Sequence, residues 1–281
     1  MPSFDTPQPI SVQLSLGFVV ANVRITAGDR TDTTVDIQPV NPSSKADLKV
    51  ADQTRVDYTD GRLVVRGPKF GTLFGRTGAI DVTIALPSGS RLQGGTGMGE
   101  FVSEGRLGEC QFKTGYGEVR VNQAGAVHLK SGSGDITVDH AEGGADITVS
   151  NGGVNVRRID GPATVNNSNG ATWIGEVTGD LLVNAANGSI TVDRAHASLT
   201  AKTANGNMLV GEVIRGAVTL RTSAGSLEVG VRTGTAAWLD LHTRAGRVRN
   251  ELATAAGPDS TDDTVEVRAR TAIGDITVRR T

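Results

Sequence analysis

The sequence predicts an all-β protein, a parallel β-solenoid of roughly 18-residue coils that follows an irregular, β-rich N-terminal cap. Three observations predict this fold. A dipeptide ending in Gly recurs at a nearly constant spacing, apolar and polar residues alternate on both sides of it, and the 281 residues include 37 Gly but only 6 Phe, 2 Trp and 2 Tyr. Because one such coil cannot bury its apolar residues alone, successive coils must stack to form a common core. The recurring glycines are Gly99, Gly117, Gly134, Gly152, Gly170, Gly188, Gly206, Gly225 and Gly246.

Each recurring Gly opens a short strand. Two and four residues after it the residues are mostly apolar, as at Ile190 and Val192, and the residues between are mostly polar. This period-two alternation is typical of a half-buried strand. A second inward-facing strand lies seven and five residues before the Gly, as at Leu181 and Val183. Each coil therefore has two main strands, and an apolar residue such as Val177 leaves a third, very short strand open.

Two columns of polar residues mark one corner of the coils. Asn precedes the turn Gly in four successive coils, and Asn-Gly is a strong turn signal. Stacked side-chain amides explain this column better than deamidation or glycan attachment, because the period itself accounts for it. Three residues before the Gly, hydroxyl and amide side chains predict a hydrogen-bonded ladder rather than a catalytic group. The two columns are Asn151, Asn169, Asn187 and Asn205, and Thr114, Ser131, Asn167, Thr203, Thr222 and Thr243.

We expect the cap over residues 1–92 and the solenoid over residues 93–281, with a flexible excursion at about 251–264 and a complete final coil at 265–281. A cap is needed because the end of a solenoid exposes core residues and unpaired strand edges. Within the cap, the segment from Ser44 to Asp52 is a candidate helical turn. The expected cap strands are Ile10–Leu16, Asn22–Thr26, Thr34–Gln38, Arg62–Arg66 and Ala79–Leu86.

Composition narrows the possible partners and the compartment. The net charge of −2 argues against nucleic acid as a partner. The single cysteine excludes an internal disulfide, and Cys110 falls in an inward column, where a small core residue is expected. The N-terminus has no basic stretch followed by an apolar run, and no apolar run is long enough to span a bilayer. We therefore expect a cytoplasmic protein.

The segment Ile80–Ser90, IDVTIALPSGS, is followed by repeats of the type Ser-Gly-Asp-Ile-Thr-Val. This combination resembles the bacterial DUF4097-type "putative adhesin" family of β-strand repeats, whose function is unknown. The resemblance covers about residues 10–281 and implies a β-solenoid, but no activity, because the adhesin name is itself an analogy. In lacking a recognisable export signal, the chain resembles unexported actinobacterial members of that family.

No catalytic, cofactor or metal site is predicted. The Gly94–Gly99 segment precedes a strand, so no helix N-terminus is available for a pyrophosphate. Asp135 and Asp146 lie in turns that echo a calcium-binding β-roll, but the neighbouring coils carry Asn-Gly instead. Trp173 and Trp238 are too isolated for a sugar platform. The four histidines fall in different columns, which argues against a metal site; they are His128, His140, His196 and His242.

Two candidate interaction sites remain. The first is a Gly-flanked loop with three large apolar residues, Phe70, Leu73 and Phe74. It is either a tip that docks a partner or touches a membrane, or a loop folded back over the cap core. The second is a basic stripe four residues before the turn Gly, with Arg247, Arg249 and Arg268 widening it near the C-terminal end. The stripe column reads Lys113, Lys130, Thr148, Asn166, Asn184, Lys202, Arg221, His242 and, in the final coil, Arg270.

The stripe has two interpretations. Its side chains either splay into solvent and pair with Asp146, Asp240 or Glu228, or they form a weakly binding surface for an acidic protein or for lipid headgroups. The function that follows is a non-enzymatic cytoplasmic interaction scaffold, which binds a protein partner or another copy of itself through solenoid faces. The alternatives are a surface adhesin-like binding protein and a carbohydrate-active β-helix enzyme.

Overall fold

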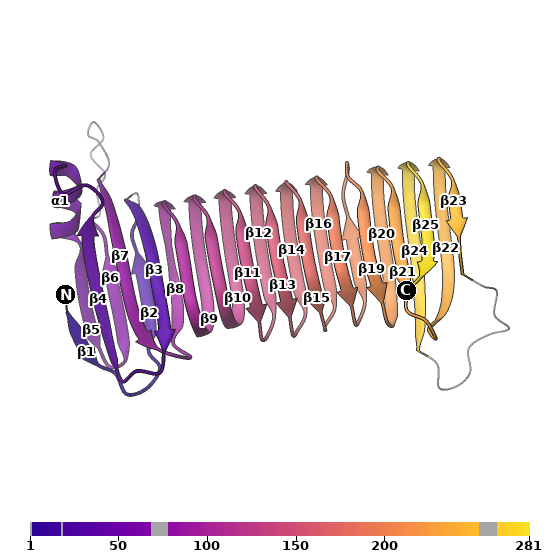
Figure 1. Cartoon of the computed structure of the whole chain (residues 1–281). Helices are drawn as coiled ribbons and strands as arrows, with labels where there is room; N and C mark the ends of the chain where they lie inside the picture. The colour runs from indigo at the N-terminus through magenta and orange to yellow at the C-terminus, as the bar shows by residue number, and fades with distance from the viewer. Residues whose placement is uncertain (1, 18, 69–77, 253–262) are drawn as a thin grey trace. The chain divides into compact units, whose positions relative to one another are not determined.

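The computed structural model describes residues 2–17, 19–68, 78–252 and 263–281. It divides the chain into two compact units, Met1–Glu142 and Gly143–Thr281. Both are built from stacked parallel strands, which confirms the all-β, solenoid-type fold (Figure 1).

Unit 1 contains eleven strands and one helix among its described residues. They are β1 (Ser3–Asp5), β2 (Ser11–Ser15), β3 (Val20–Gly28), β4 (Asp32–Pro39), α1 (Lys45–Gln53), β5 (Arg55–Thr59), β6 (Arg62–Arg66), β7 (Ala79–Pro87), β8 (Arg91–Met98), β9 (Phe101–Tyr116), β10 (Val119–Ser133) and β11 (Ile136–Ala141). The five expected cap strands correspond to β2, β3, β4, β6 and β7, whereas β1 and β5 were not anticipated.

Parallel stacking in unit 1 extends into the region predicted as a cap. Strand β2 lies between β6 and β8, so Val12 faces Leu63 on one side and Leu92 on the other. Strand β3 pairs with β7 and with β9 in the same parallel manner. The predicted boundary between residues 92 and 93 falls inside β8.

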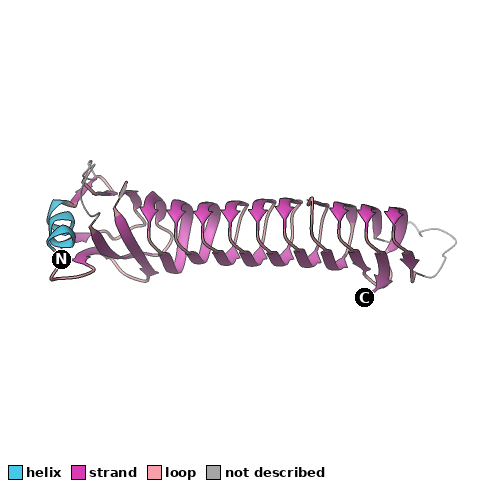
Figure 2. Cartoon of the chain, turned by 90° about the horizontal axis from the view of Figure 1, so that it is seen from above, coloured by secondary structure: helices cyan, strands magenta, loops and turns pink. Residues whose placement is uncertain are grey.

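The N-terminal end of this stack is covered. Strand β4 pairs antiparallel with β7, β1 with β4, and β5 with β6. The helix α1, cyan in Figure 2, lies against β4 and β7. The helix exceeds the single turn expected, and the Ser44 side chain caps it by accepting from the Asp47 N–H at 3.3 Å. The Ser44 hydroxyl donates to Asp47 Oδ1 at 2.9 Å, and the Asp47 carboxylate also accepts from the Ala79 N–H at 3.2 Å. The hydrogen bond from Ser44, followed by those from the Ala79 and Asn41 N–H groups, lowers the pKa of Asp47.

Unit 2 consists of two rows of strands. The first row follows the turn glycines and contains, in stacking order, β13 (Val154–Ile159), β15 (Thr172–Val177), β17 (Ile190–Ala195), β19 (Met208–Val213), β21 (Leu227–Val231), β25 (Ile276–Arg280) and β23 (Val248–Asn250). The second row contains β12 (Ala145–Asn151), β14 (Ala163–Asn169), β16 (Leu181–Asn187), β18 (Leu199–Lys202), β20 (Gly216–Ala224), β24 (Thr264–Ile273) and β22 (Ala236–Ala245).

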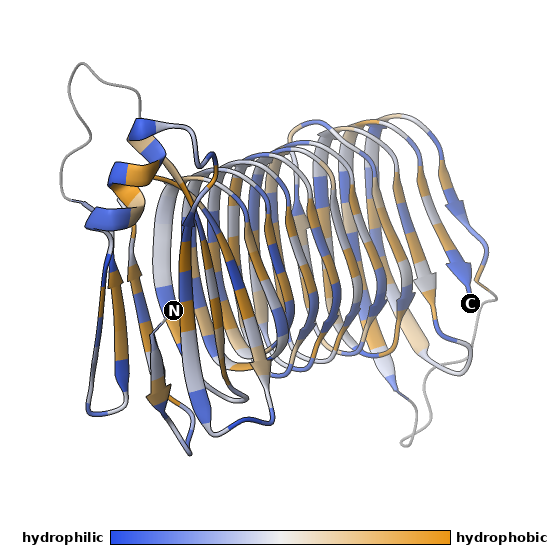
Figure 3. Ribbon diagram, turned by 60° about the vertical axis from the view of Figure 1, so that its left-hand side comes forward, coloured by the Kyte–Doolittle hydropathy of each residue, from blue (hydrophilic) through white to orange (hydrophobic). Residues whose placement is uncertain are grey.

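The core follows the predicted register. Apolar and polar residues alternate along the strands (Figure 3), and Ile190 and Val192 are 1% and 0% exposed. Val177 is also buried, but it ends β15 rather than forming a third strand. The described coils of unit 2 therefore carry two strands each.

Gly is required at the turn because consecutive coils touch there through their backbones. Gly188 has φ +137°, and a Cβ on it would lie 2.0 Å from the carbonyl oxygen of Gly170. A side chain at this position would push the coils apart, since real Cβ atoms do not approach that closely. The recurrence of Gly thus reflects both backbone conformation and stacking distance.

The last coil does not stack where the sequence order suggests. Strand β24 pairs with β20 on one edge and with β22 on the other, and β25 lies in the same way between β21 and β23. The final coil contains β24 and β25, but it is inserted before the coil that precedes it in sequence. The excursion predicted at 251–264 mostly falls outside the described residues.

We expect cysteine cross-linking to report this insertion. Thr219 faces Arg268, and Arg268 faces Asp240. Neighbouring parallel strands are about 4.8 Å apart, within disulfide reach, whereas residues two strands apart are about 10 Å apart. The pair Thr219→Cys with Arg268→Cys should therefore form a disulfide, and the pair Thr219→Cys with Asp240→Cys should not. Mass spectrometry of the oxidised proteins distinguishes these results; the opposite outcome would indicate sequential stacking.

The register predicts the effect of one charge in the core. Ile190→Asp places a carboxylate without a partner in the core and should lower the free energy of unfolding by at least about 3 kcal/mol. The matched control is Thr191→Asp, whose side chain is half-buried on the opposite face of β17 and whose cost should be about 1 kcal/mol or less. Chemical denaturation measures both; equal stability of the two variants would contradict the register.

Candidate functional site

The turn asparagines form a hydrogen-bonded ladder, as predicted. The Nδ2 of Asn169 donates to Oδ1 of Asn151 at 3.2 Å, and the Nδ2 of Asn187 donates to Oδ1 of Asn169 at 2.9 Å. Asn205 continues the ladder by donating to Asn187 at 2.9 Å. These amides bond to one another along the stack, which is the structural role expected of the column.

The hydroxyl column at the same corner bonds mainly to backbone carbonyls. Thr203 donates to the Ala186 oxygen at 3.2 Å, Thr222 to the Gly206 oxygen at 3.3 Å, and Thr243 to the Gly274 oxygen at 2.9 Å. Ser131 is the exception, because its buried Oγ has no hydrogen-bond partner among the described residues. The column is therefore a polar ladder rather than a set of exposed nucleophiles.

Four basic side chains line up on the outer face of the second row, and we call them the basic row: Lys202, Arg221, Arg270 and His242. Lys202 lies opposite Arg221, and Arg221 lies opposite Arg270. Arg270 lies opposite His242 on the last strand of the row. The insertion of β24 changes the expected order, since it places Arg270 rather than His242 beside Arg221.

The basic row is only partly neutralised. Arg270 makes an ion pair with Asp240 at 2.9 Å. Lys202 and Arg221 are exposed and make no ion pair with a described residue. Glu228, one of the expected partners, instead pairs with Arg279 at 2.8 Å. Two adjacent strands at one end of the row, β18 and β20, therefore carry charges that no described residue neutralises.

The residues expected to widen the stripe fall into two groups. Arg268 adjoins the basic row on β24, where it pairs with Glu266 at 2.5 Å and lies 5.9 Å from the centre of the Trp238 ring. Arg249 is on β23 in the first row, and Arg247 immediately precedes that strand. These two arginines thus belong to the other side of the coil. Lys113 and Lys130 face each other in unit 1.

The remaining predicted site cannot be compared with the structure. Phe70, Leu73 and Phe74 lie outside the described residues. Their assignment as a docking tip stays a prediction.

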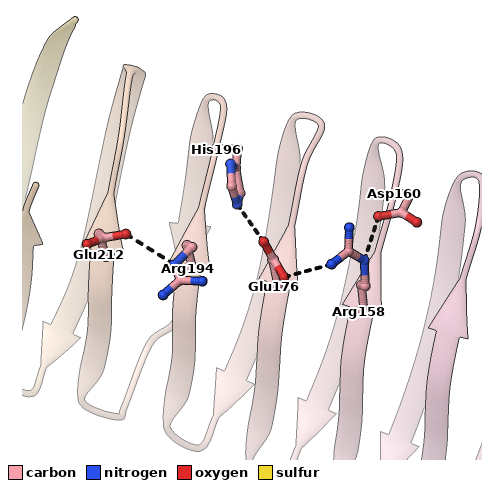
Figure 4. A network of polar contacts seen from close by, with 6 residues as sticks. All are labelled: Arg158, Asp160, Glu176, Arg194, His196 and Glu212. Atoms are coloured by element: carbon pink, nitrogen blue, oxygen red, sulfur yellow. Dashed lines mark hydrogen bonds and ion pairs between the residues drawn. The ribbon is translucent and has the colours of Figure 1, made fainter.

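Sequence reasoning missed a ladder of alternating charges on the first row (Figure 4). Glu176 accepts from Arg158 at 3.1 Å and from His196 Nε2 at 2.7 Å, and Arg194 pairs with Glu212 at 3.1 Å. Arg158 also pairs with Asp160 at 2.8 Å. The signal was present in the sequence as Arg158, Glu176, Arg194 and Glu212, which recur every 18 residues with alternating sign.

Unit 1 has its own cross-coil ion pair. Arg106 binds Glu142 through both Nε and Nη2, the latter at 2.6 Å, and Gln123 donates to the same carboxylate at 2.7 Å. The hydrogen bond from Arg106 is the main cause that lowers the pKa of Glu142, against the opposing effect of burial. The contact joins side chains 36 residues apart in sequence.

Two further observations concern metal binding and membrane-spanning helices. In the described ranges, no group of three His, Cys, Asp or Glu side chains is arranged to hold a metal ion. None of the described helical residues forms a segment long and apolar enough to cross a membrane.

The stacked coils, the asparagine ladder and the ordered charge columns define a parallel β-solenoid repeat protein. The chain belongs to the Toastrack DUF4097 family, whose model matches residues 12–279. This confirms the resemblance drawn from Ile80–Ser90 and the repeats. A search of curated proteins finds no match.

Similar solved structures include a "putative adhesin" from Bacteroides fragilis, a "putative adhesin" from Parabacteroides distasonis and a "putative lipid binding protein" from Parabacteroides distasonis. Their identities to this chain are 12%, 12% and 10%, with TM-scores of 0.36, 0.35 and 0.31. Each alignment covers 100% of this chain and 95% of the other chain. The narrower resemblance to unexported actinobacterial members finds no support in these comparisons.

Burial of Cys110 predicts an unreactive thiol. The side chain is 0% exposed, and burial, with a smaller effect from Glu109, raises its pKa to about 12. At pH 8 only about one molecule in 10⁴ then carries the reactive thiolate. We expect a thiol reagent such as 5,5′-dithiobis(2-nitrobenzoate) to label the protein in denaturant but not in buffer. Fast labelling of the folded protein would show that Cys110 is accessible.

Proposed function

We propose that this Toastrack-family protein is a non-enzymatic interaction scaffold and that the outer face of the second row in unit 2 binds an acidic segment of a protein partner. The observation that supports the proposal is the basic row, in which Lys202 and Arg221 stand on adjacent strands without ion pairs to described residues. Like charges at the spacing of neighbouring strands repel each other by roughly 1 kcal/mol in water before screening. Carboxylates of a partner would relieve this repulsion.

The surroundings of the row favour a narrow acidic partner over a broad one. Thr148, Asn166 and Asn184 continue the same column without charge, and the Nδ2 of Asn184 donates to Asn166 Oδ1 at 3.1 Å. The positive charge is therefore concentrated on β18, β20 and β24 rather than spread along the row. The alternating ladder on the first row is already paired internally, so it offers less attraction to an anion.

The proposal includes a cytoplasmic location. Cell fractionation separates it from the adhesin-like alternative, because an adhesin would be recovered on the outer cell face. Hydrolysis of acidic polysaccharides by the purified protein would support the third class, a carbohydrate-active β-helix enzyme.

A charge-reversal variant tests the binding face. The triple variant Lys202→Glu, Arg221→Glu and Arg270→Glu should bind a poly-glutamate peptide at least about tenfold more weakly than the parent, because attraction becomes repulsion. Binding by the parent should fall with added salt, since exposed charges are screened. Isothermal titration calorimetry at low and high salt measures both effects.

The matched control reverses three exposed arginines of unit 2 outside the row: Arg157→Glu, Arg215→Glu and Arg232→Glu. It changes the net charge equally and should keep most of the peptide affinity. Equal affinities of parent and triple variant would mean that the basic row is only a solvated face. Binding to vesicles containing anionic lipid, with none to the peptide, would favour a lipid surface as the ligand.

A further inference from the structure

The coil formed by β22 and β23 ends the stack of unit 2, and no described strand pairs with its outer edge (Figure 1). In interior coils, the N–H of the turn Gly and the N–H two residues later donate to the next coil, as Gly206 does to the Ala224 oxygen and Met208 to the Ser226 oxygen, both at 2.9 Å. The equivalent groups of the last coil are those of Gly246 and Val248. They donate to no described residue.

The apolar residues of this end coil are also incompletely covered. Val248 is 45% exposed, whereas Leu227, in the same column of an interior coil, is 1% exposed. Leu239 and Leu241 are half-buried, although the equivalent residues of other coils are buried. An end of this kind requires a cap, because it exposes both core and hydrogen-bonding groups.

We infer that the β22–β23 edge binds the same edge of a second copy of this chain, related by a twofold axis perpendicular to the stack. Rotation about an axis normal to the strands places β22 antiparallel to β22 of the other copy, and β23 antiparallel to its own counterpart. The outer edges of β22 and β23 then each pair with a strand of the other copy.

Charge favours one register for β22, because only an axis through His242 places Asp240 opposite Arg244 of the other copy. The backbone groups of Leu241 and Thr243 point toward the outer edge of β22, as those of Gly246 and Val248 do in the rest of the coil. In an interior coil the equivalent Thr203 N–H donates to the next coil. When the axis passes through His242, Leu241 pairs with Thr243 of the other copy, and Asp240 lies opposite Arg244 of the other copy. Moving the axis to Asp240 or to Arg244 would bring identical charges face to face, which is destabilising in a sheet.

The same axis suits β23. His242 lies four residues before Gly246 and Arg249 four residues after Ala245, so both are equally far from the corner between Ala245 and Gly246 and are placed opposite each other across the coil. An axis through His242 therefore also passes through Arg249. It places Arg247 opposite Glu251 of the other copy, which gives a second pair of complementary charges. The contact of Arg249 with its own copy is the unfavourable element of this arrangement.

Such a contact forms a closed dimer rather than a filament, because it uses the same edge of both copies. The described N-terminal end of unit 1 is covered by antiparallel strands and α1, so it offers no equivalent parallel stack end for a head-to-tail contact. The dimer places the basic rows of both copies on one face. This interface does not depend on the proposed function of that row.

Charge-swap variants test the interface in the full-length protein by sedimentation equilibrium. We expect the parent to dimerise, and Asp240→Arg or Arg244→Asp alone to raise the dimer dissociation constant by about tenfold or more. The double variant Asp240→Arg with Arg244→Asp should restore dimerisation, because it exchanges the two charges across the same pair. Arg247→Glu and Glu251→Arg, alone and combined, provide an independent second series.

Far-UV circular dichroism and thermal unfolding establish whether each variant is folded. If a variant of the Asp240–Arg244 series is unfolded, the Arg247–Glu251 series tests the interface in its place. A parent that stays monomeric at about 100 μM would overturn the inference. A dimer that is unaffected by both single reversals would overturn it as well, as would double variants that fail to recover. Removal of the repulsion by Arg249→Ala should tighten the dimer, and a weaker dimer would contradict the register.

Discussion

The structure depends on backbone contact between consecutive coils. At Gly188 there is no room for a Cβ against the Gly170 carbonyl, so the hydrogen bonds from coil to coil form at full strength only when the turn carries Gly. This contact sets the register of the remaining residues of each coil against those of the next coil. The inward residues meet in columns, and the turn asparagines come within hydrogen-bond distance of one another. Outward-facing columns such as the basic row are a further result of the same register.

Much of the fold could be predicted from the sequence, because the period and the alternation determine which residue faces inward. Ile190 and Val192 are examples. The same regularity concealed the order of the coils. Thr219, Asp240 and Arg268 occupy one column, and a column shows that residues align but not which coil lies between which others. The break in the period after Asn250 was the available signal of a change in threading.

The candidate site was predicted in part for the same reason. Lys202, Arg221 and Arg270 could be assigned to one outer column, but their order depends on where β24 inserts. Arg247 and Arg249 were assigned to the wrong side of the coil, because they lie beside or on β23 in the first row, whereas Arg268 lies on β24 in the second row. The Arg158–Glu176 pair was missed, since alternating sign becomes visible only after the residues are aligned by coil.

The insertion of β24 and β25 has a consequence for folding during synthesis. Residues 236–250 are made before residues 264–280, yet their strands pair only with these later ones among the described residues. The growing chain therefore cannot extend its stack one coil at a time to the end. Among the described strands, β22 and β23 lack their native pairing partners until β24 and β25 have been synthesised and have inserted between them and β20–β21. The order in which the chain is made and the order in which it packs differ at this one place.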